Sequence, residues 1–252
     1  MGGDGFKMPR FFVAKGNILG NSILIVGDDV NHIKNVLRCR IGDKLIVCDG
    51  ERNDYTVEIA GFEKDCVRTI IIEHAGNAAE PRTDITLFQC IPKHDKLDFI
   101  IQKGIELGVN RIVPVISERT IIKIENEADR AKKASRWRKI ALEAAKQCDR
   151  GIIPEISLPI SLGNAFNNAG SYDLCIIPYE KDRGNRLKFH INKGSGGKIA
   201  LFIGPEGGFT ETEIQTAQKS GISPVTLGPR ILRTETAAIA VLSILMYELG
   251  EL

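Results

Sequence analysis

The chain has 252 residues, of which 43% are hydrophobic and 26% charged, and this is the composition of an ordinary globular protein. The net charge of +2 says nothing by itself about nucleic acid, and no apolar run approaches the roughly 18 residues that span a membrane. The six cysteines contain no C-x-x-C pair and the four histidines are dispersed, which argues against a zinc site and a disulfide framework. We therefore predict a cytoplasmic protein without metal, whose cysteines are reduced.

The first residues, MGGDGFK, carry neither an apolar secretory segment nor the Ser or Thr that a myristoylation signal has at the position of Phe6. We expect residues 1–7 to be a short disordered leader or a cloning remnant in front of Met8. Residues 8–76 are predicted to form a small β-rich domain. Its expected strands are separated by Gly and Asp turns, and they are RFFVA, SILIV, KLIVCD, YTVEIAG and CVRTIIIEH.

The segment DDVNHIKNVLR predicts one helix inserted among these strands, with Asp28 or Asp29 as its N-cap. Its apolar residues share one side of the helix, and they are Val30, Ile33, Val36 and Leu37. A compact barrel with one inserted helix accounts for this pattern. The polar stretch that follows, HAGNAAEPRTD, is typical of a domain linker.

Residues 84–252 have a different pattern, in which buried strands alternate with helices. The strands are ITLFQCIP, RIVPVIS, YDLCIIPYE, KIALFIGPEGG and PVTLGP, and the helices include DKLDFIIQKGIELG, TETEIQTAQKSG and TETAAIAVLSILMYELG. Thr210 and Glu213 have the spacing of a capping box at the start of one helix. This alternation predicts an α/β domain with a parallel sheet that is covered on both faces.

Residues 130–150, RAKKASRWRKIALEAAKQCDR, are predicted to form a basic helix. One side recurs at spacings of three and four and is expected to be buried, and its residues are Ala134, Trp137, Ala141, Ala144 and Cys148. The basic residues of another side, interrupted by Glu143, are Lys132, Arg136, Lys139, Lys146 and Arg150. A solvated helix face and an electrostatic footprint for a phosphate backbone both remain open for that side.

The stretch LFIGPEGGFTETE, residues 201–213, runs from an apolar strand through a glycine-rich turn into a helix. A P-loop needs Gly-Lys-Ser/Thr after its glycines, and a dinucleotide site needs G-x-G-x-x-G at the first helix of its unit, so neither pattern fits. Glu206, Glu211 and Glu213 crowd the start of the helix, where they would repel a phosphate. The turn is therefore predicted to face a ligand that is neutral or positively charged.

A second Gly-Pro turn follows another strand, in LGPRILRTETAA at residues 227–238. Each turn taken alone is explained by the need for glycine in a tight turn. Two such turns at the carboxyl ends of neighbouring strands instead predict a shared ligand crevice. Beside the second turn, the polar residues are Arg230, Arg233, Glu235 and Thr236.

The two turns resemble the C-terminal signature of SPOUT-class methyltransferases, IGPEGGFT-x-x-E followed by LG-x-x-ILR-x-ETA. Together with PRFF, HIKNVLRCRIGD, KLDFIIQKGIELGV, IVPVISERT and RWRKIALEAAKQCDR, they make the chain from about Pro9 onward similar to the 16S rRNA uridine-N3 methyltransferases. This resemblance implies a PUA-like β-barrel domain, residues 8–76, followed by a SPOUT α/β domain with a trefoil knot, residues 84–252. It also implies S-adenosylmethionine as cofactor, a homodimer, and uridine 1498 of 16S rRNA in the small ribosomal subunit as the target.

By the same resemblance, the cofactor is expected to contact Tyr179, Glu180, Ile203, Gly204, Glu206, Gly207, Leu227, Gly228, Ile231, Leu232 and Ala237. For catalysis, Arg233 is the candidate for stabilising a uracil anion. Glu235 or Glu206 is the candidate for accepting the N3 proton or orienting the base. Each carboxylate is equally well explained as a helix cap or a loop anchor.

RNA contacts are expected from basic residues in both domains, namely Arg10, Lys34, Arg38, Lys93, Lys96, Arg136, Lys139 and Arg150. Each of them is also explained as a solvated surface charge. The last helix is apolar nearly all round, so it must be buried by its own domain or by a partner. Two alternatives remain, namely a SPOUT methyltransferase that acts on tRNA or a ribose 2′-OH, and a non-catalytic RNA-binding protein with this fold.

Overall fold

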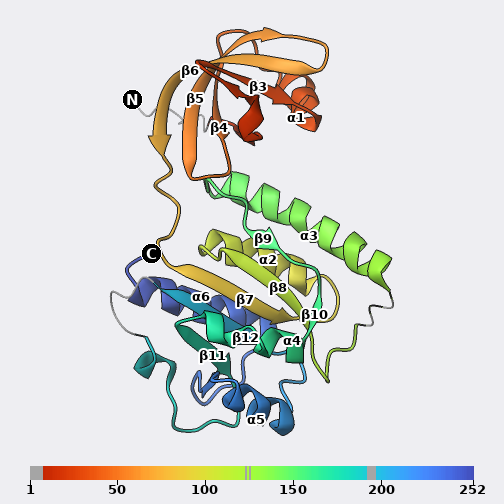
Figure 1. The fold of residues 1–252 in the computed structure, drawn as a ribbon, viewed down its shortest axis with the longest axis vertical. Helices are drawn as coiled ribbons and strands as arrows, with labels where there is room; N and C mark the ends of the chain where they lie inside the picture. Colours follow the sequence, from red (N-terminus) through yellow and green to blue (C-terminus); the bar gives the residue numbers. More distant parts are fainter. Residues whose placement is uncertain (1–7, 123, 125, 192–196) are drawn as a thin grey trace. The chain divides into compact units, whose positions relative to one another are not determined.

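The computed structural model describes residues 8–122, 124, 126–191 and 197–252, and the chain divides into two compact units (Figure 1). The first unit contains the chain up to Glu80 together with Ala145–Ile153, and the second contains Pro81–Ala144 and Pro154–Leu252. The expectation for residues 1–7 lies outside the described residues. Among the helices of the described ranges, none is long and apolar enough to cross a membrane. All six cysteines are free thiols.

The first unit is built on one six-stranded sheet with the order β1-β4-β5-β6-β3-β2. The strands are β1 (Arg10–Phe12), β2 (Ile18–Leu19), β3 (Ser22–Val26), β4 (Lys44–Cys48), β5 (Asn53–Phe62) and β6 (Cys66–Gly76). Neighbouring strands are antiparallel except β1 and β4, which run parallel. Alternate residues point inward, so that Ile23 and Ile25 of β3 meet Val57 and Ile59 of β5 in a buried apolar core. The five predicted strands are all present.

The predicted helix of the first unit is shorter and differently wound. It begins as α1 (Asp28–Asn31) and continues as a π-helical turn, His32–Val36. Gly27 occupies the N-cap position with a φ of 76°, and no side chain caps the helix, so the prediction of an aspartate cap is wrong. Val36 is 64% exposed, because the wider π turn rotates the residues after Ile33 out of the α-helical register. Leu37, predicted on the same buried side, is exposed as well.

A buried ion pair holds residues 145–153 in the first unit. The side chains of Arg150 and Glu80 are 2% and 1% exposed, and Nη2 of Arg150 lies 2.9 Å from Oε2 of Glu80. Oε1 of Glu80 also accepts hydrogen bonds from the backbone N–H groups of Gly151 and Ile152, each at 2.9 Å. Glu80 is therefore satisfied by one cation and two amides, and these bonds tie the segment after α3 (Glu127–Gln147) to residue 80.

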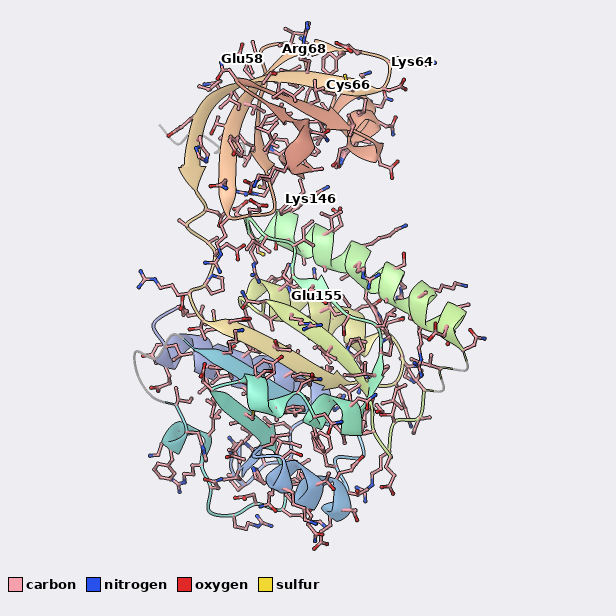
Figure 2. All side chains as sticks on the ribbon, in the orientation of Figure 1. Glu58, Lys64, Cys66, Arg68, Lys146 and Glu155 are labelled. Atoms are coloured by element: carbon pink, nitrogen blue, oxygen red, sulfur yellow. The ribbon has the colours of Figure 1, made fainter. Side chains whose placement is uncertain are left out.

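Asn77 and Asp29 join the same segment to other parts of the first unit. Arg10 donates two hydrogen bonds to the carboxylate of Asp54, at 2.8 and 2.9 Å, and Asn77 donates both to Asp54 and to the backbone carbonyl of Asp149. Lys146, labelled in Figure 2, pairs with Asp29 at 3.1 Å. These contacts explain why a segment far along the sequence belongs to the first unit.

The second unit contains a seven-stranded sheet in which every pair is parallel, as predicted. Six strands follow the order β10-β8-β7-β12-β11-β13, and β9 pairs with β8. The strands are β7 (Asp84–Cys90), β8 (Arg111–Ile116), β9 (Glu155–Ile156), β10 (Ile160–Ser161), β11 (Leu174–Pro178), β12 (Lys198–Ile203) and β13 (Ser223–Val225). The sequence analysis did not predict β9 or β10, which have only two residues each.

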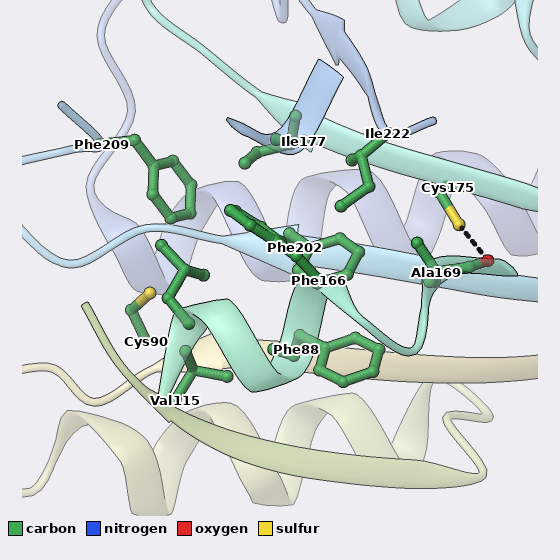
Figure 3. Close-up of a cluster of buried hydrophobic side chains, with 14 of the residues drawn as sticks. Phe88, Cys90, Val115, Phe166, Ala169, Cys175, Ile177, Phe202, Phe209 and Ile222 are labelled. Carbon is green, nitrogen blue, oxygen red and sulfur yellow. Dashed lines mark hydrogen bonds between the residues drawn. The ribbon is translucent and has the colours of Figure 1, made fainter. Parts of the chain in front are cut away.

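Helices cover both faces of this sheet, as the near-continuous apolar strands predicted. The helices, besides α3, are α2 (Lys96–Glu106), α4 (Leu162–Phe166), α5 (Glu211–Lys219) and α6 (Thr234–Glu248). Figure 3 shows the face covered by α4, where the rings of Phe88 and Phe202 stack with centroids 4.5 Å apart. On the other face α2 packs against α6. Ala134, Trp137, Ala141 and Ala144 of α3 are buried as predicted, whereas Cys148 lies beyond the end of that helix.

We predict that Glu80→Gln destabilises the first unit by about 3–5 kcal/mol, because the substitution removes a negative charge that lies 2.9 Å from the buried Arg150 guanidinium. Urea unfolding followed by circular dichroism measures the change. The matched control is Glu155→Gln, which removes a partner of Arg111 from a pair whose side chains are 61% and 45% exposed. We expect the control to cost less than about 1 kcal/mol. Equal losses in the two variants would contradict the role given to the buried pair.

Asp54 makes the stability of the first unit depend on pH. Burial alone would raise the pKa of Asp54, but hydrogen bonds from Arg10, Cys48 and Asn77 and the charge of Arg10 outweigh it and lower the pKa below 3.8. The stabilisation is therefore present above about pH 4 and is lost as the pH falls through the lowered value. We predict that the urea midpoint falls less steeply below about pH 4 in Asp54→Asn than in the unmodified protein. Identical pH profiles would show that Asp54 does not contribute in this way.

Candidate functional site

A cavity lies at the carboxyl end of the sheet of the second unit, where β11, β12 and β13 end beside the start of α6. Parallel strands bring the loops that follow them to one edge, which is where open α/β sheets bind ligands. The cavity has a volume of about 280 Å³, at the lower end of the range for small-molecule sites. Three loops line it, comprising residues 178–180, 203–209 and 226–232.

The structure brings all the residues predicted to hold the ligand to this one cavity. Its wall contains Tyr179, Glu180, Ile203, Gly204, Glu206, Gly207, Leu227, Gly228, Ile231, Leu232 and Ala237. The cavity is also lined by residues that were not predicted to contact the ligand, namely Pro178, Pro205, Gly208, Phe209, Thr226, Pro229, Arg230 and Thr234. All of these lie within two positions of a predicted residue, so their nearness in the sequence to the predicted residues was the available signal.

Two glycines of the glycine turn, residues 204–208, have neighbours that crowd the position of a Cβ atom. Gly208 has a φ of 67°, and a Cβ there would lie 3.2 Å from Oε1 of Glu180. A Cβ on Gly204 would lie 3.1 Å from the ring of Phe209. Gly204, Gly207 and Gly208 line the cavity and have no side chains, so their backbone groups can approach a flat ligand closely.

A buried hydroxyl group joins the glycine turn to α6 and β7. Thr234 Oγ1 donates a hydrogen bond of 2.6 Å to the carbonyl oxygen of Gly204 and accepts one of 3.0 Å from Nε2 of Gln89. Thr234 is 5% exposed and Gln89 is fully buried. Because buried polar groups are costly without partners, these bonds fix the glycine turn and the start of α6, which line the cavity, relative to β7. We refer to Gln89, Thr234 and Gly204 as the threonine junction.

Glu206 lines the cavity, but its carboxylate is tied to the protein. Oε1 accepts a hydrogen bond of 3.0 Å from the backbone N–H of Lys93 and lies 3.3 Å from Nζ of Lys96. Burial alone would raise the pKa of Glu206, but the backbone N–H groups of Glu206 and Lys93, together with Lys96, outweigh it and lower the pKa. The geometry thus gives Glu206 a role in shaping the turn.

The glutamates at the start of α5 have structural partners as well. The capping box predicted from Thr210 and Glu213 is present, with the Thr210 N–H donating to Oε2 of Glu213 at 2.8 Å. Oε1 of Glu213 accepts a further bond from the backbone N–H of Glu118. The helix start is therefore capped by its own carboxylate, as expected for a turn that does not bind phosphate.

The two predicted catalytic residues lie at the N-terminus of α6, next to residues that line the cavity. Arg233 is the N-cap residue of α6, and its side chain is exposed and makes no capping bond. Glu235 is in the first turn, with a side chain that is 18% exposed, and its Oε2 lies 3.3 Å from Nζ of Lys96. In the described part of the chain, no group of three or more His, Cys, Asp or Glu residues is arranged to hold a metal ion.

Two of the predicted RNA-binding residues are turned inward by their partners. Arg150 is 1% exposed and paired with Glu80, and this burial contradicts the prediction that it contacts RNA. The side chain of Arg10 is 9% exposed and forms an ion pair with Asp54, which argues in the same way against the predicted RNA contact of Arg10. Both guanidinium groups stabilise the first unit instead.

The remaining RNA-binding predictions fall on accessible or partly accessible residues. Arg136 pairs with Asp98, and Lys34 donates to the backbone carbonyl of Glu63. Arg38, Lys93 and Lys139 have exposed side chains. Lys96 pairs with the carboxylates of Glu206 and Glu235, and these ion pairs explain its charge without RNA. An RNA contact by Lys96 stays a prediction.

Two family models match the chain. Residues 79–246 match the model described as RNA methyltransferase domain, and residues 25–71 match the RNA methyltransferase PUA domain. The chain is 34% identical over 229 residues to ribosomal RNA small subunit methyltransferase E of Bacillus subtilis, and the match covers 89% of each protein.

Solved structures agree with these matches. The crystal structure of a ribosomal RNA small subunit methyltransferase E from Neisseria gonorrhoeae bound to S-adenosyl methionine has a TM-score of 0.85 at 35% identity, covering 95% of this chain and 97% of that one. A putative methyltransferase from Legionella pneumophila in complex with the cofactor SAM has a TM-score of 0.85 at 32% identity, with 96% and 98% covered.

We predict that Gly208→Ala destabilises the second unit by about 1 kcal/mol or more, because the alanine must adopt a positive φ and meets the carboxylate of Glu180. Thermal unfolding measures the change. Gly163→Ala in α4 is the control, because a Cβ there meets nothing within 4 Å and the φ of Gly163 is not positive. A Gly208→Ala protein as stable as the control would show that the turn tolerates side chains.

Proposed function

Because the chain belongs to the ribosomal RNA small subunit methyltransferase E family, we propose that it methylates the N3 atom of a uridine in 16S rRNA, at the family target uridine 1498. The resemblance found in the sequence is confirmed at the level of the family. The protein is accordingly a methyltransferase whose cofactor is S-adenosylmethionine. The observation that carries the proposal is the single cavity that collects all the predicted cofactor residues.

The cavity suits this cofactor in charge and in shape. S-adenosylmethionine supplies an electrophilic methyl group on a sulfonium cation, and it carries no phosphate. The uncovered backbone of residues 203–208 and 227–232 offers amide and carbonyl groups to the edge of an adenine ring. The carboxylates of Glu180 and Glu206 on the wall are compatible with a positively charged ligand and unfavourable for a polyanion.

The chemical step requires that N3 of uracil lose a proton and gain a methyl group. Deprotonation leaves negative charge on O2 and O4, and Arg233 at the N-terminus of α6 can stabilise it with its cation and with the helix dipole. Glu235 is the better candidate for the proton acceptor or for orienting the base, because Glu206 is held by Lys93 and Lys96. Since N3 is hidden in a base pair, the target uridine is unpaired or flipped out when it reacts.

The organisation of the molecule follows from the family. We assign RNA capture to a PUA-like barrel domain, residues 8–76, and methyl transfer to a SPOUT domain with a trefoil knot, residues 84–252. The knot is inferred from the resemblance of the two glycine turns to the SPOUT signature. From the family we also infer a cytoplasmic location and a homodimer. Exposed apolar side chains of α6 are compatible with a partner chain, since Ile244 is 42% and Tyr247 is 72% exposed.

The test is methylation of 16S rRNA, free or in 30S particles, from cells that lack the activity, followed by nuclease digestion and mass spectrometry. We expect 3-methyluridine at a single position, with transfer that depends on S-adenosylmethionine and binding of that cofactor seen by calorimetry. Methylation of tRNA or of a ribose 2′-OH would assign the chain to another SPOUT activity. Cofactor binding without transfer to any RNA would also contradict the proposed reaction.

A further inference from the structure

Lys96 joins the glycine turn to the N-terminus of α6. Its ammonium nitrogen lies 3.3 Å from Oε1 of Glu206 and 3.3 Å from Oε2 of Glu235. The three side chains come from three different elements, namely α2, the turn after β12, and α6. They are 30%, 30% and 18% exposed, so the cluster is partly shielded from water.

Lys96 lies at the end of α2 where a positive charge is unfavourable. It is the first residue of the helix, where the helix dipole disfavours a cation and favours an anion. The unfavourable placement is offset by two carboxylates, which would repel each other if no cation stood between them. The ion pairs therefore explain why Lys96 lies at this end of α2.

Glu206 and Glu235 depend on Lys96 to different degrees. Glu206 also accepts the backbone N–H of Lys93, which holds its carboxylate in place without help from Lys96. Oε2 of Glu235 is buried and has no hydrogen-bond partner in the described ranges, so the charge of Lys96 is its compensation. Removing the ammonium group would leave a buried carboxylate oxygen uncompensated, and the side chain of Glu235 would turn toward water.

We propose that Lys96 is a positioning residue for methyl transfer, which acts by holding the carboxylate of Glu235 toward the reacting base. The inference rests on the proposed uridine methylation and on the role of Glu235 in it. Lys96 does not touch the substrate in this scheme. Its contribution is to hold the carboxylate of Glu235 in a fixed direction at the start of α6, where it meets the N3 proton.

The experiment compares Lys96→Met with Lys103→Met, using the full chain, S-adenosylmethionine and the 16S rRNA substrate. Lys103 lies on the same helix and pairs with Glu106 in a single i,i+3 contact, so it controls for the loss of one lysine. We expect Lys96→Met to lower kcat about tenfold or more, with KM for RNA changed less than about threefold. Lys96→Arg restores at least part of kcat, and Lys103→Met leaves both parameters unchanged.

A double-mutant cycle separates positioning from a structural effect. If Lys96 acts through Glu235, the variant that combines Lys96→Met with Glu235→Gln has the same kcat as Glu235→Gln alone. Multiplicative losses overturn the inference, and so does a Lys96→Met protein whose KM rises while kcat is unchanged, since that result indicates an RNA contact. Should Lys96→Met fail to fold in the unfolding assay, Lys96→Gln takes its place in the cycle. Absence of uridine methylation by the unmodified protein would instead reject the proposed function itself.

Discussion

The hydroxyl group of Thr234 is the contact on which the site depends, because it connects three segments that are far apart in the sequence. It donates to the glycine turn through the carbonyl of Gly204 and accepts from Gln89 at the end of β7. With this junction in place, α6 begins beside the loops that follow β11, β12 and β13. The cavity exists because these loops and the start of α6 are held at one edge of the sheet.

Three carboxylates in and near the cavity are held by donors of the protein. Glu206 is bound by an amide and an ammonium group, Glu213 caps α5, and Glu235 lies beside Lys96. Carboxylates held in this way keep their positions when no ligand is bound, and they still offer negative charge to a ligand. It suits a cationic methyl donor and disfavours phosphate.

Some basic residues pair with carboxylates inside the protein, and others lie on its surface. Arg10 forms an ion pair with Asp54, and Arg150 forms one with Glu80 that holds residues 145–153 in the first unit. The exposed Lys139 of α3 lies earlier on the helix whose last residues belong to that unit. A count of basic residues along the sequence therefore overstates the number of basic side chains that are available to RNA, because the sequence does not show which cations have internal partners.

The sequence by itself determined the local elements and the chemical character of the site. Apolar alternation and apolar runs located every strand longer than two residues, and spacing located the capping box of Thr210 and Glu213. The two Gly-Pro turns predicted a shared crevice, and the resemblance to a known family named the residues expected to line it. The tertiary structure alone decided which side chains are satisfied by others. It placed Arg150 against Glu80 and Lys96 between Glu206 and Glu235, because such pairs join residues 70 to 139 positions apart and leave no periodic trace in the sequence.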